Sequence, residues 1–320
     1  MKYLFFRVDS SYALASGHLV RCYRLAKVFS KKYQIIFITN KFNGNFNFII
    51  KDFRKIYLNG KSSSSINTNK DSKKVIEIIK KFTGEKIILV DHYDLDSKWH
   101  KDVSKYVNKL ICINDYLKKN YCDYLINETY FPNKISQKCL KKNTKIFCGP
   151  KYAMIDCVKT KKLKANGIFI FFGSVDEKNV TLRLIKILKK ITNEKIFIII
   201  GKRNKNKNKI LAIKKKNFLF IDKYTNLNLY LRKCNTAIVA GGSIVWETLY
   251  NKVNTIVIPT ARNQYSNIKN LEKDKIIQTL YLNKLNENAL KSIIFQKKNN
   301  FFKNIVDGNG IKRIYKGVIK

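Results

Sequence analysis

Short apolar runs alternate along the chain with segments whose apolar residues recur every three or four positions. The apolar runs are unbroken rather than alternating with polar residues, which is typical of strands covered on both faces. They predict strands at 1–8, 34–39, 86–90, 109–113, 145–148, 167–172, 195–200, 218–221, 236–239 and 255–258. The periodic segments predict helices at 19–29, 72–82, 97–107, 179–191, 243–249 and 263–274. Strands that alternate with helices in this order predict parallel sheets.

The length of 320 residues predicts two domains of roughly 150 residues each. A polar, basic stretch at 159–166 (KTKKLKAN) separates two apolar regions and is interpreted as the linker. The predicted fold class is α/β, with a doubly wound, Rossmann-like domain at 1–158 and a second one at 159–320. Because open parallel sheets bind ligands at the carboxyl ends of their strands, the site is expected in a cleft between the two domains.

A formal net charge of +43 raises the question of nucleic-acid binding. Only nine of the 65 basic residues are arginine, and the lysines are scattered among many Asn, Ile, Phe and Tyr residues. This mixture is typical of a genome poor in G and C. We therefore expect no nucleic-acid partner, and we interpret the charge as compatible with an acidic substrate such as a nucleotide diphosphate.

Seven cysteines without a CxxC pair indicate neither a disulfide framework nor a zinc site. The first apolar stretch is too short for a signal sequence, and no apolar run approaches the roughly 18 residues of a membrane span. We expect a cytoplasmic protein that binds no metal and no cofactor. The sequence leaves the oligomeric state open, with a monomer as one alternative.

Gly17 and His18 lie where the loop after the first predicted strand becomes a helix. The positive end of a helix disfavours the imidazolium form, so His18 is expected to be neutral near pH 7 and able to act as a general base. Asp9 ends the first strand and is either a catalytic group or a hydrogen-bonding partner of the loop.

A second cluster, Asp91, His92 and Tyr93, follows the predicted strand at 86–90. Asp91 is expected to orient His92 or the loop, and Tyr93 to line a sugar pocket. The alternative is a hydrogen-bonded turn without a catalytic role.

Three further loops follow strands in the second half. Gly241, Gly242 and Ser243 open the helix that carries Glu247, a pattern that favours a phosphate on the backbone and a ribose hydroxyl on the carboxylate. An exposed helical glutamate is the alternative for Glu247.

Gly173 and Ser174 begin a loop in which Ser174, Asp176 or Asn179 could cap the next helix. The amides of Asn263 and Gln264 are candidates for sugar hydroxyls, with an N-cap as the alternative for Asn263.

Taken together, these stretches resemble one family, the UDP-sugar hydrolases of pseudaminic acid biosynthesis. Its members act on UDP-2,4-diacetamido-2,4,6-trideoxy-β-L-altropyranose and share the two-domain GT-B architecture of MurG-type glycosyltransferases. The matching pieces are RVDSSYALASGHLVRCYRLA (7–26), LVDHYDLDSKW (89–99), INDY (113–116), CDYLINETY (122–130), CGPKYAMI (148–155), FFGSVDEKNVT (171–181), GGSIVWETL (241–249) and IPTARNQ (258–264).

The resemblance implies that water removes UDP from the amino sugar with inversion and without a metal. It assigns the catalytic histidine to His18, the pyrophosphate loop to 241–243, the ribose contact to Glu247, and sugar contacts to Tyr93 and Asn263. The full predicted site has His18, Asp9 and Tyr93 as catalytic residues. Its substrate-binding residues are Gly17, Arg21, His92, Gly173, Ser174, Gly241, Gly242, Ser243, Glu247, Asn263 and Gln264. A MurG-like glycosyltransferase that uses a UDP-amino sugar is the alternative function.

The sequence departs from the family pattern at Ala15, Ser174, Asn251 and Val253, where the family has Gly or Pro. A β-carbon at a position that needs positive φ costs about 1 kcal/mol or more. We therefore expect local strain or an altered sugar pocket at these positions.

Overall fold

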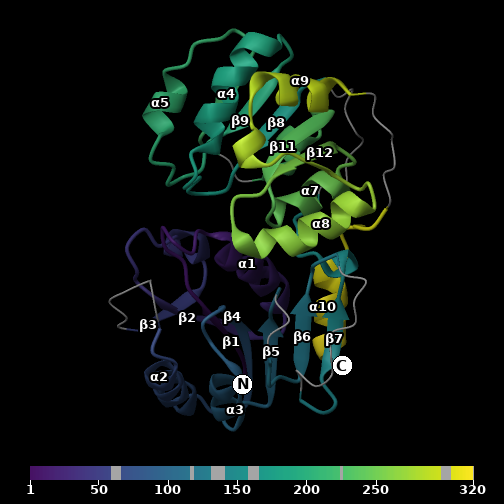
Figure 1. The fold of residues 1–320 in the computed structure, drawn as a ribbon. Coiled ribbons are helices and arrows are strands. Elements are labelled where there is room, and N and C mark those ends of the chain that lie inside the picture. The colour runs from purple at the N-terminus through teal and green to yellow at the C-terminus, as the bar shows by residue number, and fades with distance from the viewer. Residues whose placement is uncertain are drawn as a thin grey trace. The chain divides into compact units, whose positions relative to one another are not determined.

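Two parallel sheets organise the chain in a computed structural model (Figure 1). The structure describes residues 1–58, 66–115, 119–130, 141–157, 166–223, 226–296 and 304–319. The chain divides into two compact units, Met1–Met154 with Asn309–Lys320, and Ile155–Gly308. The predicted α/β fold class with two Rossmann-like domains is confirmed.

The sheet of the first unit has the order β3-β2-β1-β4-β5-β6-β7 over the described residues, with every neighbouring pair parallel. Its strands are β1 (Lys2–Val8), β2 (Gln34–Asn40), β3 (Arg54–Leu58), β4 (Glu85–Asp91), β5 (Lys109–Ile113), β6 (Tyr124–Asn127) and β7 (Lys145–Cys148). The helices of this unit are α1 (Gly17–Phe29), α2 (Thr68–Lys80), α3 (Ser97–Ser104) and α10 (Gly310–Ile319). Short 3-10 helices lie at Asn47–Ile50 and Pro150–Tyr152.

The second unit repeats this winding with the order β10-β9-β8-β11-β12-β13, again within the described part of the chain. Its strands are β8 (Ile168–Phe171), β9 (Ile196–Ile199), β10 (Phe218–Ile221), β11 (Thr236–Ala240), β12 (Asn254–Ile258) and β13 (Gln278–Thr279). The helices are α4 (Val180–Ile191), α5 (Lys207–Leu211), α6 (Asn228–Leu231), α7 (Ile244–Tyr250), α8 (Tyr265–Lys273) and α9 (Glu287–Phe295). Short 3-10 helices lie at Arg262–Gln264 and Leu282–Lys284.

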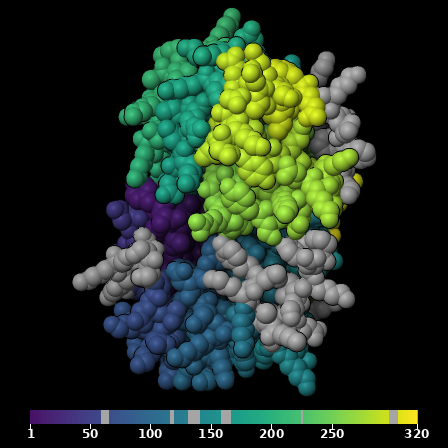
Figure 2. All heavy atoms as spheres, in the orientation of Figure 1, coloured from purple at the N-terminus to yellow at the C-terminus, as the bar shows by residue number. Residues whose placement is uncertain are grey.

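Apolar side chains fill both faces of the central strands, as the unbroken apolar runs predict. All six residues after Lys2 in β1 are buried, and so are all five residues of β11. In the space-filling view, side chains of the flanking helices and loops hide the strands of both sheets (Figure 2). The strand order reverses between β1 and β4 and between β8 and β11, so each unit has a switch point at which Rossmann-like sheets bind ligands.

Two strands of the first sheet escaped the sequence prediction. β3 is an edge strand of five residues that begins with Arg54 and Lys55 and has one buried residue, Leu58, and β6 is only four residues long. Such short segments carry too few residues to establish a pattern. β6 nevertheless matters for function, because its carboxyl end carries a residue of the site described below.

The C-terminal helix corrects the predicted domain boundary. The proposed linker at 159–166 lies outside the described residues except for Asn166, and residues 309–320 belong to the first unit rather than to the second. The aromatic rings of Phe29 in α1 and Tyr315 in α10 lie 5.1 Å apart, and Ile314 and Val318 are fully buried. The apolar face of α10 therefore completes the core of the first unit.

No helix in the described part of the chain is long and apolar enough to cross a membrane.

Candidate active site

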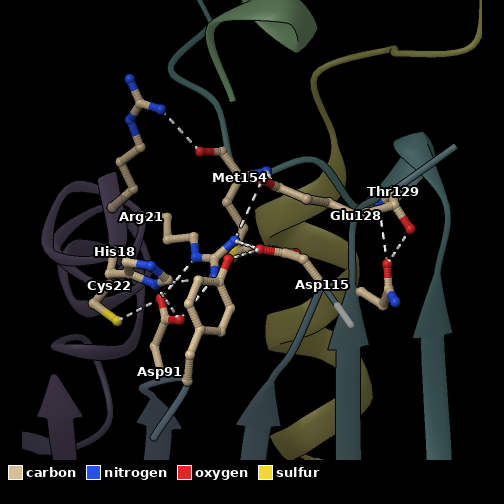
Figure 3. A network of polar contacts seen from close by, with 11 residues as sticks. His18, Arg21, Cys22, Asp91, Asp115, Glu128, Thr129 and Met154 are labelled. Carbon is tan, nitrogen blue, oxygen red and sulfur yellow. Dashed lines mark hydrogen bonds and ion pairs between the residues drawn. The ribbon is translucent and has the colours of Figure 1, made fainter. Parts of the chain in front are cut away.

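An acidic residue lies at, or within two residues after, the carboxyl end of each of three neighbouring strands in the first unit. Asp91 is the last residue of β4, Asp115 lies two residues after β5, and Glu128 directly follows β6. Because the strands are parallel neighbours, their carboxyl ends share one edge of the sheet. The amino-terminal turns of α1 supply His18 and Arg21 to the same place (Figure 3).

His18 and Asp91 form a hydrogen-bonded pair, with 2.7 Å between Nδ1 and the carboxylate Oδ1. Burial alone would raise the pKa of Asp91, but the charges and hydrogen bonds of Arg21 and His18 outweigh burial and hold that pKa well below its ordinary value. An ionised carboxylate only accepts hydrogen bonds, so Nδ1 of His18 carries the proton that is donated to Asp91. In the neutral ring Nε2 then has the lone pair and can accept a proton. An imidazole oriented in this way is suited to general-base catalysis.

Arg21 holds the carboxylates together. Its Nε and one terminal nitrogen donate to the two oxygens of Asp91 at 2.6 and 2.7 Å, and its other terminal nitrogen donates to Asp115 at 2.7 Å. These contacts already occupy the guanidinium of Arg21. They therefore favour a structural role for Arg21 over its predicted role in binding the substrate. The thiol of Cys22 also donates to Asp91, at 3.6 Å. Burial raises the pKa of this thiol well above its usual range, which disfavours the nucleophilic thiolate form.

Tyr93 contacts both the ring of His18 and the carboxylate of Asp115. Its hydroxyl donates to Asp115 at 2.9 Å, and its ring meets the ring of His18 edge to face with 4.6 Å between centroids. Burial raises the pKa of Tyr93 far above its usual range, and Asp115 raises it further, so the hydroxyl acts as a donor. The structure thus brings two predicted catalytic residues, His18 and Tyr93, into contact.

Glu128 connects this cluster to the end of the first unit. One of its carboxylate oxygens lies 3.6 Å from Arg21, and the other accepts a hydrogen bond from the backbone N–H of Met154 at 3.1 Å (Figure 3). Burial raises the pKa of Glu128 to about 7, against the opposing charge of Arg21 and with further increases from Asp115 and Asp91.

Asp9 and His92 belong to a separate buried network and do not share the contacts of His18. Asp9 lies 2.9 Å from Arg7 and accepts hydrogen bonds from the backbone and side chain of Asn40. Nε2 of His92 lies 3.4 Å from Asp9, and Nδ1 of His92 accepts from the backbone of Asp94. The hypothesis that Asp91 orients His92 is wrong, since the contacts of Asp91 are with His18, Arg21 and Cys22. Asp9 has the contacts of its alternative interpretation, a loop-stabilising residue.

The predicted phosphate loop of the second unit has a tightly packed first glycine. A Cβ at Gly241 would lie 2.3 Å from the terminal methyl of Ile268 in α8 and 3.0 Å from Cβ of Gln264, so a larger residue would require these side chains to shift. A Cβ at Gly242 would meet no described atom within 4 Å, and Gly242 is exposed. Gly242 and Ser243 thus offer open backbone at the start of α7.

The side chain of Gln264 forms hydrogen bonds to the backbone of this loop and of the segment after β12. Its side-chain oxygen accepts hydrogen bonds from the backbone of Thr260 at 2.9 Å and of Gly241 and Ala261 at 3.3 Å. The neighbouring Asn263 is exposed, and the residue that precedes the 3-10 helix is Ala261, so Asn263 is not its N-cap.

Glu247 lies on α7 and is 3% exposed, which excludes the alternative that it is an exposed helical glutamate.

In the loop after β8, Asp176 is the residue that caps helix α4. Its carboxylate accepts hydrogen bonds from the backbone N–H groups of Val180 and Thr181 at 2.9 and 3.0 Å. Asn179 occupies the N-cap position of α4 without a side-chain capping bond. Gly173 has φ +84° and precedes the buried Ser174.

The four departures from the family pattern have different consequences. Ala15 has φ +54°, so the expected strain is present there. Ser174 and Val253 are not among the described residues with positive φ, and Asn251 has φ −80°. In that turn the positive φ of +54° falls on Lys252 instead. The prediction of a positive φ is therefore wrong for Ser174 and Asn251, the two other positions where the family has Gly.

Asp115 and Glu128 are site residues that the sequence pattern does not indicate. Both lie within the motifs INDY and CDYLINETY, and both follow a short strand at the same sheet edge as Asp91. Both are more than 90 residues from Arg21 in the sequence, so their contacts with Arg21 depend on the strand order.

Comparison with known proteins gives a family for much of the second unit and a fold for the whole chain. Residues 167–303 match the family described as Glycosyltransferase family 28 C-terminal domain. No curated protein sequence is significantly similar to the chain.

Three solved structures that are similar in fold can be named. MurG of Acinetobacter baumannii is 11% identical with a TM-score of 0.67, and the match covers 100% of this chain and 99% of MurG. UGT89C1 of Arabidopsis thaliana complexed with UDP is 10% identical with a TM-score of 0.67 and full coverage of both chains. The calicheamicin glycosyltransferase CalG4 is 9% identical with a TM-score of 0.63, covering 100% of this chain and 94% of CalG4. Residues 167–303 thus resemble the C-terminal domain of family 28 glycosyltransferases, and the whole chain has the MurG-like, two-domain GT-B fold.

Proposed function

We propose that this protein is an inverting enzyme that cleaves the anomeric bond of a UDP-sugar, with His18 as its general base. The observation that carries the proposal is the contact of 2.7 Å between Nδ1 of His18 and Asp91, because it leaves Nε2 as the proton acceptor. The fold shared with MurG and with a UDP complex supports a nucleotide-sugar substrate.

The proposed step transfers one proton and one glycosyl group. Nε2 of His18 takes the proton of the attacking hydroxyl, whose oxygen forms a bond to the anomeric carbon. The bond from that carbon to the diphosphate oxygen breaks on the opposite face, and its electron pair leaves with UDP. Asp91 stabilises the imidazolium that forms, as a carboxylate does in a hydrogen-bonded catalytic pair.

We assign the nucleotide to the second unit. The open backbone at Gly242 and Ser243 is suited to the pyrophosphate, with Gly241 holding the loop against α8 and Gln264 ordering it. Glu247 is assigned to the ribose, Asn263 to the sugar, and Gly173 and Ser174 to the loop beside the phosphates. In the first unit we assign Gly17, Tyr93 and His92 to positions near the base and the sugar. Asp9 and Arg21 are assigned to holding this region in place.

Transfer of the sugar to an acceptor hydroxyl is the activity that the comparisons favour. The family match is to glycosyltransferases, and MurG and CalG4 are similar in fold. Hydrolysis is the second candidate, because the Gly-His-x-x-Arg-Cys and Asp-His-Tyr motifs resemble those of the hydrolases that release a diacetamido sugar for pseudaminic acid. The chemistry at His18 is the same in both cases, and only the source of the hydroxyl differs.

The experiment is incubation with a panel of UDP-amino sugars, with and without sugar acceptors, followed by NMR of the products. Transfer predicts a new glycoside that forms only with an acceptor. Hydrolysis predicts UDP and free sugar in water alone, with inverted configuration at the anomeric carbon. Failure to consume any UDP-sugar, with the protein folded and binding UDP, would contradict both.

A further inference from the structure

Glu128 is a buried carboxyl group whose two oxygens face different parts of the first unit. Its side chain is 6% exposed. One oxygen lies 3.6 Å from the terminal nitrogen of Arg21 that also donates to Asp115, and the other accepts from the backbone N–H of Met154. A buried carboxyl group placed between an arginine and a backbone amide holds both in position.

Met154 is the last residue of the first unit before the chain enters the second. Side chains hold both of its backbone polar groups. Its N–H donates to Glu128 at 3.1 Å, and its carbonyl accepts from Arg24 at 3.0 Å. Arg24 lies one turn after Arg21 on α1, so the helix that carries His18 also contacts the connecting segment.

The contacts continue from Arg21 to the proposed base. Arg21 donates to both oxygens of Asp91, and Asp91 accepts the Nδ1 proton of His18. Removal of Glu128 would take away one of three carboxylates that lie beside Arg21 and leave Asp91 and Asp115. The position of its guanidinium, and with it the carboxylate that orients His18, would then change.

Resting on the proposed function, we propose that Glu128 is a positioning residue for His18. It acts through Arg21 and Asp91, and its hydrogen bond to Met154 ties this network to the residue at which the chain leaves the first unit. Glu128 does not touch the reacting atoms in this proposal.

The test uses the full chain with Glu128→Gln and Glu128→Ala. Glutamine has one carbonyl oxygen where glutamate has two acceptor oxygens, so Glu128→Gln loses one of the two contacts and Glu128→Ala loses both. Glu85→Gln and Glu85→Ala are the matched controls, because Glu85 lies at the amino end of β4 in the same unit and pairs with Lys2.

Two readouts are independent of activity. The chain has three histidines, so the imidazole ¹⁵N signals of His18 can be compared with those of His92 and His100. We expect the His18 signals to move in both Glu128 variants, with the other two histidines unchanged. Amide exchange at Met154 should accelerate in Glu128→Ala, and neither readout should respond to the Glu85 variants.

Kinetics supply the third readout. Misplacement of a catalytic group by small distances can cost up to about 100-fold in rate, so we expect kcat to fall by about tenfold to 100-fold in Glu128→Ala with KM nearly unchanged. Unchanged His18 signals in folded Glu128→Ala would overturn the proposal, and so would altered signals with a wild-type kcat. If the wild-type protein cleaves no UDP-sugar, the proposed function fails, while the signals of His18 and Met154 still decide whether Glu128 orders this network.

Discussion

The two ring nitrogens of His18 have different environments. This difference predicts which kinetic parameter a replacement of His18 changes. Nδ1 is bound to Asp91, so the proton transfer assigned to the ring takes place at Nε2. General-base catalysis typically contributes about 10²- to 10⁴-fold, so His18→Ala and His18→Asn are each expected to lower kcat by about that factor. UDP affinity, measured by calorimetry, should stay nearly unchanged, and a variant with wild-type turnover would remove His18 from the chemistry.

Glu247→Ala is expected to have the opposite profile. Hydrogen bonds to charged groups contribute about 1.5–3 kcal/mol, so loss of the proposed ribose contact should weaken UDP binding by roughly 10- to 100-fold. Glu247 is buried, so circular dichroism and thermal unfolding must accompany the titration to show that the variant is folded. An unaltered UDP affinity in a folded variant would contradict the assignment.

The buried pair of Arg7 and Asp9 predicts a pH dependence of stability. Burial raises the pKa of Asp9, but the charge of Arg7 together with the contacts of His92 and the Asn40 backbone outweighs burial and holds that pKa well below the ordinary 3.8. A lowered folded-state pKa contributes stability that is present above pH 3.8 and is lost as the pH falls toward the folded value. The free energy of unfolding of the first unit should therefore decrease steadily below about pH 4.

Arg7→Met provides the control for this dependence. Breaking a buried ion pair typically costs about 3–5 kcal/mol, so the variant should be less stable by about that amount at pH 7. The deficit should shrink as the pH falls below about 4, because the stability that ionised Asp9 contributes to the folded wild type is progressively lost there. A deficit that does not vary with pH, by urea unfolding, would contradict the ionic origin.

At the scale of single elements, the loop before α1 contains a strained residue. Ala15 has φ +54°, a conformation that costs a residue with a β-carbon about 1 kcal/mol relative to glycine. Ala15→Gly is therefore expected to stabilise the protein by up to about 0.6 kcal/mol, after the greater freedom of glycine in the unfolded chain is subtracted. Ala13→Gly, in the same loop at a position without positive φ, should be neutral or destabilising. Equal effects of the two substitutions in thermal unfolding would refute the strain.

Elements with long apolar patterns could be predicted from the sequence, whereas contacts between strand ends could not. α1 begins at Gly17, two residues before the periodic segment starts, and β11 ends one residue after the predicted strand. The position of His18 at a helix start was therefore predictable. Its partner was not, because Asp91 is next to His92 in the sequence and contacts His18 only because β1 and β4 are neighbours.

The same reason explains the missing carboxylates. Asp115 and Glu128 reach Arg21 because β4, β5 and β6 are consecutive in the sheet, and β6 was too short to be predicted. In the second unit the local pattern was more informative: Gly241, Gly242 and Ser243 lie between β11 and α7, as predicted. Loop motifs within one strand and helix are thus easier to predict than networks assembled from several strands.

At the scale of the whole molecule, the chain returns to the first unit after completing the second. α10 packs against α1 and β7: Tyr315 meets Phe29, a Cβ at Gly317 would lie 2.5 Å from the ring of Phe147, and Val318 accepts a hydrogen bond from Lys109 at 2.8 Å. Stability of the first unit should therefore depend on residues far away in the sequence. The second unit, Ile155–Gly308, is continuous and has no such dependence on the C-terminal helix.

Ile314→Ala tests this dependence in the full chain. Ile314 is fully buried in α10, and truncation of a buried isoleucine to alanine typically costs about 2–5 kcal/mol. Because that contact belongs to the first unit, hydrogen exchange should accelerate in β5, β6 and α1, while β8, β11 and β12 keep their protection. Lys312→Ala, on the exposed side of the same helix, should leave both units unchanged. Acceleration confined to the second unit, or a loss of protection equal in both, would contradict the assignment of α10 to the first core.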